Sequence, residues 1–66
     1  MTKEMVRLED ARILAKRSTA VYLKCLDSDF LLTVNYWVPA SQVNLRDDGV
    51  WVTKWLADRR KLSYWQ

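Results

Sequence analysis

The sequence predicts an α+β domain, a small antiparallel β-meander of three to four strands with one C-terminal helix. Residues 19–26 and 30–38 alternate between apolar and polar side chains, which is the period of a half-buried strand. The only proline, Pro39, ends the second run, and an Asp48-Gly49 turn signal precedes a third β-prone run. A helix-forming segment follows Thr53.

Length and composition indicate a single small domain with a mildly basic surface. A chain of 66 residues makes one domain, 1–66, near the lower limit for a core without disulfides or metal. Half of its residues are hydrophobic, and four tryptophans, three tyrosines and one phenylalanine supply large apolar side chains. The net charge of +3 favours nucleic acid or an acidic protein surface as a partner, although eight acidic and eleven basic side chains, interspersed, are also typical of a solvated surface.

The residue types that are missing argue against catalysis. Without histidine, the chain has neither a histidine-activated nucleophile nor an imidazole zinc site. One glycine excludes a phosphate-cradling loop, and adjacent Asp47 and Asp48 fit a turn better than an acid–base pair. We therefore expect a non-enzymatic protein with no cofactor and no metal.

The expected location is the cytoplasm. Cys25, the single cysteine, has no partner for an internal disulfide, which agrees with a reducing compartment. Its place on the predicted inward face favours a core residue over a nucleophile. No apolar run approaches the roughly 18–20 residues of a membrane span, and the N-terminus lacks the apolar core of a signal peptide, so no membrane partner is expected.

Residues 2–17 are ambiguous between helix and strand. Leu8, Ala11, Leu14 and Ala15 have helical spacing and composition slightly favours a helix, whereas 5–8 and 12–16 fit short strands.

The next two runs predict an antiparallel hairpin. In residues 19–26, Val21, Leu23 and Cys25 fall on one face and Tyr22 and Lys24 on the other. Asp27-Ser28-Asp29 is the expected turn, because short oxygen-bearing side chains bond to their own backbone. In residues 30–38 the apolar face consists of Leu32, Val34, Tyr36 and Val38, which directs Thr33, Asn35 and Trp37 outward.

After Pro39 the sequence predicts a turn, a polar loop, a strand and a helix. Residues 40–43 turn the chain, Asn44 to Gly49 form the polar loop, and 50–52 form the third strand. Thr53 is the expected N-cap of a helix that runs to Leu62, with Trp55, Leu56 and Leu62 on its packing face. Residues 63–66 form a tail that is frayed unless its aromatic side chains dock.

These elements carry a resemblance to a known group of proteins. The run Trp37-Val38-Pro39-Ala40-Ser41-Gln42, with the later Trp55-Leu56-Ala57, resembles small uncharacterised bacteriophage and prophage proteins that share a tryptophan, aliphatic, proline, any residue, serine, glutamine signature. The resemblance covers roughly the last two-thirds of the chain. It implies strands before the signature, which favours a strand over 12–16. The arrangement that we expect for the whole meander is SH3- or OB-like.

The chain departs from this group where Thr53-Lys54 replaces a proline before the final tryptophan, and in its additional aromatic tail. The resemblance therefore implies origin more than mechanism. Small phage proteins are often inhibitors or adaptors aimed at host machinery, anti-CRISPR proteins among them, and others bind single-stranded DNA.

Two candidate binding surfaces follow from the predicted elements. The first is the outward sheet face, with Tyr22, Lys24, Asn35 and Trp37, where aromatic rings stack on bases and lysine meets phosphate. The alternative for Trp37 is burial under the helix or the N-terminal segment. The second is the basic helix end, with Lys54, Arg59, Arg60, Lys61 and nearby Arg46. Favourable charge at the helix C-terminus explains the same clustering without a ligand. Ser41 and Gln42 fit either a loop cap or a recognition site.

The expected function is that of a phage-type binding protein that inhibits or adapts host machinery by occupying the surface of a host protein or nucleoprotein complex. The most specific form of this expectation is an anti-CRISPR role. The alternative is a single-stranded nucleic-acid-binding protein that stacks bases on Tyr22 and Trp37. A third possibility is a homo-oligomer in which Tyr64 and Trp65 complete a neighbour's core.

Overall fold

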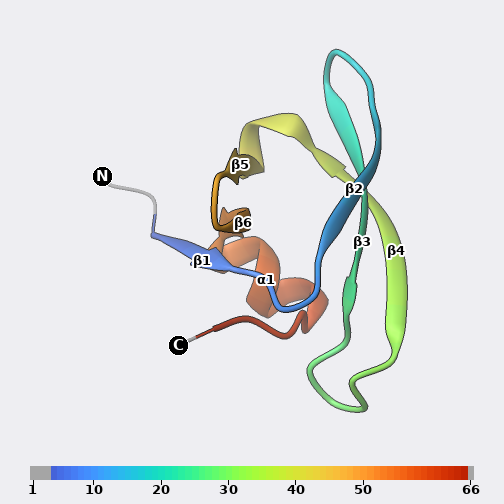
Figure 1. Ribbon diagram of the computed structural model, residues 1–66, viewed down its shortest axis with the longest axis vertical. Helices are drawn as coiled ribbons and strands as arrows, with labels where there is room; N and C mark the ends of the chain where they lie inside the picture. Colours follow the sequence, from blue (N-terminus) through green and yellow to red (C-terminus); the bar gives the residue numbers. More distant parts are fainter. Residues whose placement is uncertain (1–3, 66) are drawn as a thin grey trace.

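The computed structural model describes residues 4–65, which form six strands, one 3₁₀ helix and one α-helix. In chain order they are β1 (Met5–Arg7), β2 (Arg12–Lys16), β3 (Ala20–Leu26), β4 (Thr33–Pro39), η1 (Ala40–Gln42), β5 (Val43–Arg46), β6 (Gly49–Thr53) and α1 (Lys54–Arg60). The strands make two antiparallel three-stranded sheets, in the orders β1-β6-β5 and β2-β3-β4 (Figure 1). The predicted α+β class is confirmed, whereas a single meander of three to four strands underestimates the sheet content.

The β3–β4 hairpin is confirmed, but its second strand starts later than predicted. Asp27 Oδ1 accepts hydrogen bonds from the backbone N–H groups of Asp29 (2.6 Å) and Phe30 (2.7 Å), which is the predicted turn chemistry. Leu31 then adopts a left-handed conformation with φ of 56°, so the strand begins at Thr33. Leu32, predicted on the apolar face, lies in the loop and is 63% exposed.

The largest difference from the sequence prediction is in the polar segment after η1. Asn44 to Arg46, expected in a loop, belong to β5, which pairs with β6 from Val43↔Val52 to Arg46↔Gly49. The turn is Asp47-Asp48, and Gly49 carries the expected positive φ of 145°. The strand was missed because most of its side chains are exposed, so hydrophobic alternation is weak.

The N-terminal segment is extended where the structure describes it. β1 pairs with β6, and β2 pairs with β3 with a register shift between Ile13 and Ala15. The helical interpretation of this segment is therefore wrong and the strand over 12–16 is confirmed. Residues 2 and 3 of the ambiguous segment lie outside the described residues.

The core lies between the inward faces of the two sheets and one side of α1, as Figure 1 shows with the β2-β3-β4 sheet facing the other elements. The predicted inward residues Val21, Leu23 and Cys25 are buried. The buried apolar side chains are Val6, Leu8, Val21, Leu23, Cys25, Val38, Val50, Val52, Leu56, Ala57 and Leu62.

The helix begins as predicted and ends earlier. Thr53 is its N-cap, and Lys61 adopts a left-handed conformation (φ of 54°) that terminates it after Arg60. Leu56 and Leu62 are buried, but Trp55 is 63% exposed. Trp55 was wrongly placed on the packing face, because Leu62 reaches the core from beyond the helix end and Leu56 with Ala57 define the buried side.

The described part of the tail docks on β1. Tyr64 forms a β-bridge with Leu8, and the Trp65 N–H donates to the Arg7 carbonyl (2.8 Å). Tyr64 packs against the core of its own chain. Gln66, the end of the predicted tail, lies outside the described residues. Within residues 4–65 no helix has the length and apolar character needed to cross a membrane.

Candidate functional site

The outward face of the β2-β3-β4 sheet carries an aromatic pair. Tyr22 and Trp37 are direct cross-strand partners, with ring centroids 4.9 Å apart and a tilt of 32° between the rings. Trp37 is 45% exposed and Tyr22 is half-buried. Their predicted outward direction is confirmed, and the alternative that α1 or β2 buries Trp37 is wrong. The pair presents a continuous aromatic surface to solvent.

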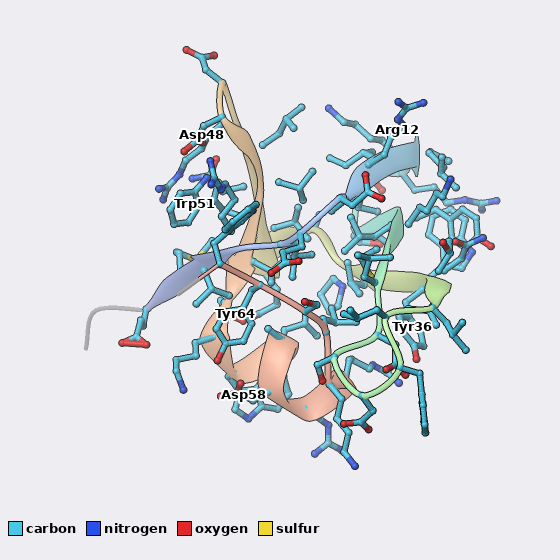
Figure 2. The ribbon with its side chains drawn as sticks, turned by 60° about the horizontal axis from the view of Figure 1, so that its bottom comes forward. Arg12, Tyr36, Asp48, Trp51, Asp58 and Tyr64 are labelled. Carbon is cyan, nitrogen blue, oxygen red and sulfur yellow. The ribbon has the colours of Figure 1, made fainter. Side chains whose placement is uncertain are left out.

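Cations surround this pair. The Arg17 guanidinium lies 5.2 Å from the centroid of the Trp37 ring. One row along the strands, Arg12, Lys24 and Asn35 lie side by side, because Lys24 pairs with both neighbours in the sheet. All three are exposed. Figure 2 shows Arg12 on this side of the molecule, away from Asp48 and Trp51.

The face has one sign of charge. None of the chain's eight carboxylates lies on β2, β3 or β4. The salt bridges among the described residues are Arg7–Asp48, Lys54–Asp58 and Lys61–Asp29, so they leave the cations of this sheet unneutralised. A cationic face with an exposed aromatic pair can hold an anionic ligand that also has flat rings.

Sequence reasoning missed Arg12 and Arg17 as members of this face. Their position depends on the pairing of β2 with β3, which stayed ambiguous because residues 2–17 fit both a helix and strands. The signal that could have indicated it is the segment 12–17, which contains Arg12, Lys16 and Arg17 and no acidic residue.

The structure separates Arg46 on β5 from the other cations of the second predicted surface, which lie on α1 and at its end. Lys54 bonds Asp58 (2.9 Å) at the start of α1, and Arg59 and Arg60 lie over two different rings, those of Trp55 (5.5 Å) and Tyr36 (5.2 Å). Arg46 lies 4.3 Å from the centroid of Trp51. Figure 2 shows Trp51 at the opposite end of the molecule from Asp58 on α1, so the prediction that Arg46 lies near the helix end is wrong.

Lys61 also contributes to structure at the helix end. Its backbone caps α1, and its Nζ lies 4.0 Å from Asp29 Oδ2. Three of the five predicted cations thus lie over aromatic rings and two pair with carboxylates.

Gln42 is a structural residue. Its Oε1 accepts a hydrogen bond from the Thr53 hydroxyl (2.6 Å), and that hydroxyl accepts from the Leu56 N–H (3.2 Å). Gln42 therefore positions the N-cap of α1, which agrees with the capping alternative. Ser41 is exposed in η1 and makes no side-chain hydrogen bond among the described residues.

A network at the surface of α1 has shifted pKa values. Hydrogen bonds from Lys54 (2.9 Å) and from the Tyr64 hydroxyl (3.0 Å) lower the pKa of Asp58, and the same bonds raise the pKa of Lys54 and of Tyr64. Figure 2 shows Tyr64 and Asp58 side by side. The network ties the tail to the helix. In the core, burial raises the pKa of the Cys25 thiol to about 11, so at neutral pH it is a protonated apolar side chain.

No group of three or more potential metal-ligating side chains is present among residues 4–65. Comparisons with family models, curated proteins and solved structures give no match to this chain. The resemblance to phage proteins and the anti-CRISPR role stay predictions.

Proposed function

We propose that this protein is a non-enzymatic, single-stranded nucleic-acid-binding protein that uses the outward face of the β2-β3-β4 sheet. The observation that carries the proposal is the Tyr22–Trp37 pair on a sheet face that has cations and no carboxylates. Unpaired bases expose their rings, and each base stacked on an aromatic side chain contributes about 1–3 kcal/mol.

The cations supply the second half of the interaction. Arg12 and Lys24 lie next to the aromatic pair along the strands, and Arg17 lies above the Trp37 ring. A strand whose bases stack on the rings brings its phosphates to these side chains. Since log K falls with log salt by about 0.7 per phosphate contact on single strands, three contacts give a slope of about −2.

Binding is tested by fluorescence anisotropy of a labelled pyrimidine oligonucleotide over a series of salt concentrations. We expect Trp37→Ala to weaken binding by about tenfold, because one stacking contact is lost. Trp55→Ala is the matched control, since Trp55 is also exposed but lies on α1, and it should bind as the unmodified protein does.

A second matched pair tests the charges. Arg17→Gln should weaken binding and reduce the magnitude of the salt slope by about 0.7. Arg59→Gln removes a guanidinium with the same kind of ring contact, 5.5 Å from Trp55 instead of 5.2 Å from Trp37, and should leave both quantities unchanged. Absence of binding at low salt, or loss of binding in the Trp55 and Arg59 variants only, would contradict the proposal.

A further inference from the structure

The two sheets have four edge strands, and three of them have features that prevent pairing with another chain. β1 has three residues and is covered by the tail through the bond from Trp65 N–H to the Arg7 carbonyl. β5 has four residues and ends in Arg46. β2 carries Arg12 and Lys16, and its register shifts at Leu14. Short length, charge and irregularity are the common protections of sheet edges.

β4 lacks these protections. It has seven residues without a charged side chain, and it pairs with β3 in seven consecutive positions with no shift in register. Among residues 4–65 its only neighbour in the sheet is β3, and Figure 1 shows its other side facing outward with no described element beyond it. β4 is therefore a long, regular and uncharged edge.

The pattern of backbone hydrogen bonds between β3 and β4 shows which N–H and C=O groups of β4 point away from β3. Asp27 N–H donates to the Leu32 carbonyl and Ala40 N–H to the Thr19 carbonyl, which fixes the alternation of bonded and non-bonded pairs between them. In that alternation Val34, Tyr36 and Val38 bond to β3. The N–H and C=O groups of Thr33, Asn35 and Trp37 therefore point away from β3, toward the open side.

These three residues are complementary to a second copy of themselves. In an antiparallel pair with the two-fold axis at Asn35, Thr33 lies opposite the partner's Trp37, and all three N–H groups of each copy find a carbonyl. Sliding the partner by two residues one way places Pro39, which has no N–H, opposite Thr33. Sliding it the other way requires the Leu31 N–H, which already donates to Asp27 (2.8 Å). One register thus uses every free donor.

The side chains agree with this register. Thr33 beside the partner's Trp37 is a β-branched and aromatic cross-strand pair, a stabilising combination. Leu32, which is largely exposed in the single chain, lies beside the partner's Val38. Self-pairing at β4 opposes no like charges, whereas antiparallel self-pairing centred on β2 would bring Arg12 toward the partner's Lys16.

We propose that this protein forms a symmetric dimer by antiparallel pairing of β4 with β4 of a second copy, with the axis at Asn35. The β2-β3-β4 sheets of the two copies then become one continuous six-stranded sheet. The inference depends on the edge alone and holds whether or not the outward face binds nucleic acid.

Sedimentation velocity over a concentration series tests the dimer. We expect a species of twice the chain mass of 7.9 kDa. Asn35→Lys and Asn35→Glu each place like charges opposite one another at the axis and should weaken self-association by at least about tenfold. Mixing the two variants in equal amounts should restore the dimer, because lysine then faces glutamate.

The control variants are Asn44→Lys and Asn44→Glu, which make the same changes at an exposed position of another edge strand, β5, and should dimerise as the unmodified protein does. Circular dichroism verifies that the Asn35 variants are folded. A monomer at every concentration would overturn the proposal, and β4 would then be an edge strand that only a chain of another kind could pair with. The proposal would also be overturned if Asn35→Lys and Asn35→Glu each dimerised when measured separately, or if their mixture failed to dimerise.

Discussion

Thr53 links three elements through one hydroxyl group. It ends β6 and caps α1 by accepting from the Leu56 N–H, and it donates to Gln42 Oε1 in η1. Thr53 is buried, so a side chain without an oxygen would leave the Leu56 N–H unpaired away from water. Gln42 thus has a structural role as the acceptor for this hydroxyl.

Removal of this hydroxyl should destabilise the fold. We expect Thr53→Ala to lower the free energy of unfolding by about 1–2 kcal/mol, the usual range for a lost N-cap. Thr19→Ala, at an exposed position in the β2–β3 turn, should change it by less than about 0.5 kcal/mol. Urea denaturation measures both. If Thr53→Ala changed the free energy of unfolding as little as Thr19→Ala does, the cap would contribute little to stability.

The Asp58 network should make stability depend on pH at both ends of the range. The pKa of Asp58 is lowered in the fold, so its contribution is present above the unfolded-state pKa and is lost as pH falls through the folded-state value. The pKa values of Lys54 and Tyr64 are raised, so their contributions are present below their unfolded-state values and are lost as pH rises through the folded-state ones.

Asp58→Asn tests this dependence, because asparagine keeps the shape and has no charge. The difference in unfolding free energy between the unmodified protein and this variant should be largest between about pH 5 and 9, and should decrease toward pH 2 and above pH 11. Urea denaturation across this range measures it. A difference that does not vary with pH would rule out the network as its source.

At the scale of the element, the end of α1 carries strain. Lys61 adopts a left-handed φ of 54° at the C-cap, where its N–H bonds to the carbonyls of Ala57 and Asp58. Residues with a Cβ are strained in this conformation, and glycine is the residue that helices most often have there. The seven-residue helix is thus ended by backbone geometry and by the burial of Leu62 just beyond it.

Two glycine substitutions at this end should have opposite effects. Lys61→Gly should raise the free energy of unfolding by about 0.5–1 kcal/mol, because it relieves the left-handed strain. Arg59→Gly, two positions earlier inside the helix, should lower it by about 0.5–1 kcal/mol. Thermal unfolding monitored by circular dichroism measures both. A loss of stability in the Lys61 variant would indicate that its ion pair with Asp29 outweighs the strain.

At the scale of the whole molecule, stability depends on few side chains. Eleven buried apolar residues fill the space between two small sheets and a short helix. A domain of this size has a small margin of stability, so the loss of one large core side chain removes much of it.

Leu23→Ala should therefore come close to unfolding the protein. Leu23 is fully buried at the centre of β3, and large-to-small substitutions at such positions cost about 2–5 kcal/mol. Leu45→Ala, at an exposed position of β5, should cost much less. Amide exchange and urea denaturation separate the two outcomes. Similar losses at both positions would mean that the core is not centred on β3.

The accuracy of prediction from sequence depended on how strongly each segment alternates. β3 and most of β4 were predicted because apolar residues recur at their inward positions, and the Thr53 cap because a hydroxyl residue precedes a run of helix formers. β5 was missed because its side chains are mostly exposed, and its pairing with β6 holds it through backbone bonds. Trp55 was misplaced because its neighbours, not its own hydrophobicity, determine which side of α1 is buried.

The candidate site was predicted in part for the same reason. Tyr22, Lys24 and Trp37 follow from the alternation within one hairpin, so their common face was visible in the sequence. Arg12 and Arg17 join them only through the pairing of β2 with β3, and the separation of Arg46 from the basic helix end follows from its place on β5.

The sequence by itself determined the class of the domain, the β3–β4 hairpin, the start of the helix and the outward direction of Trp37, because these depend on local periodicity and on the conformational preferences of proline, glycine and threonine. Only the tertiary structure decided that there are two sheets, that Arg12 on β2 and Arg17 just after it lie beside the aromatic pair, and that β4 remains an open edge. These features depend on which strands pair, and pairing is set by contacts between residues far apart in the chain.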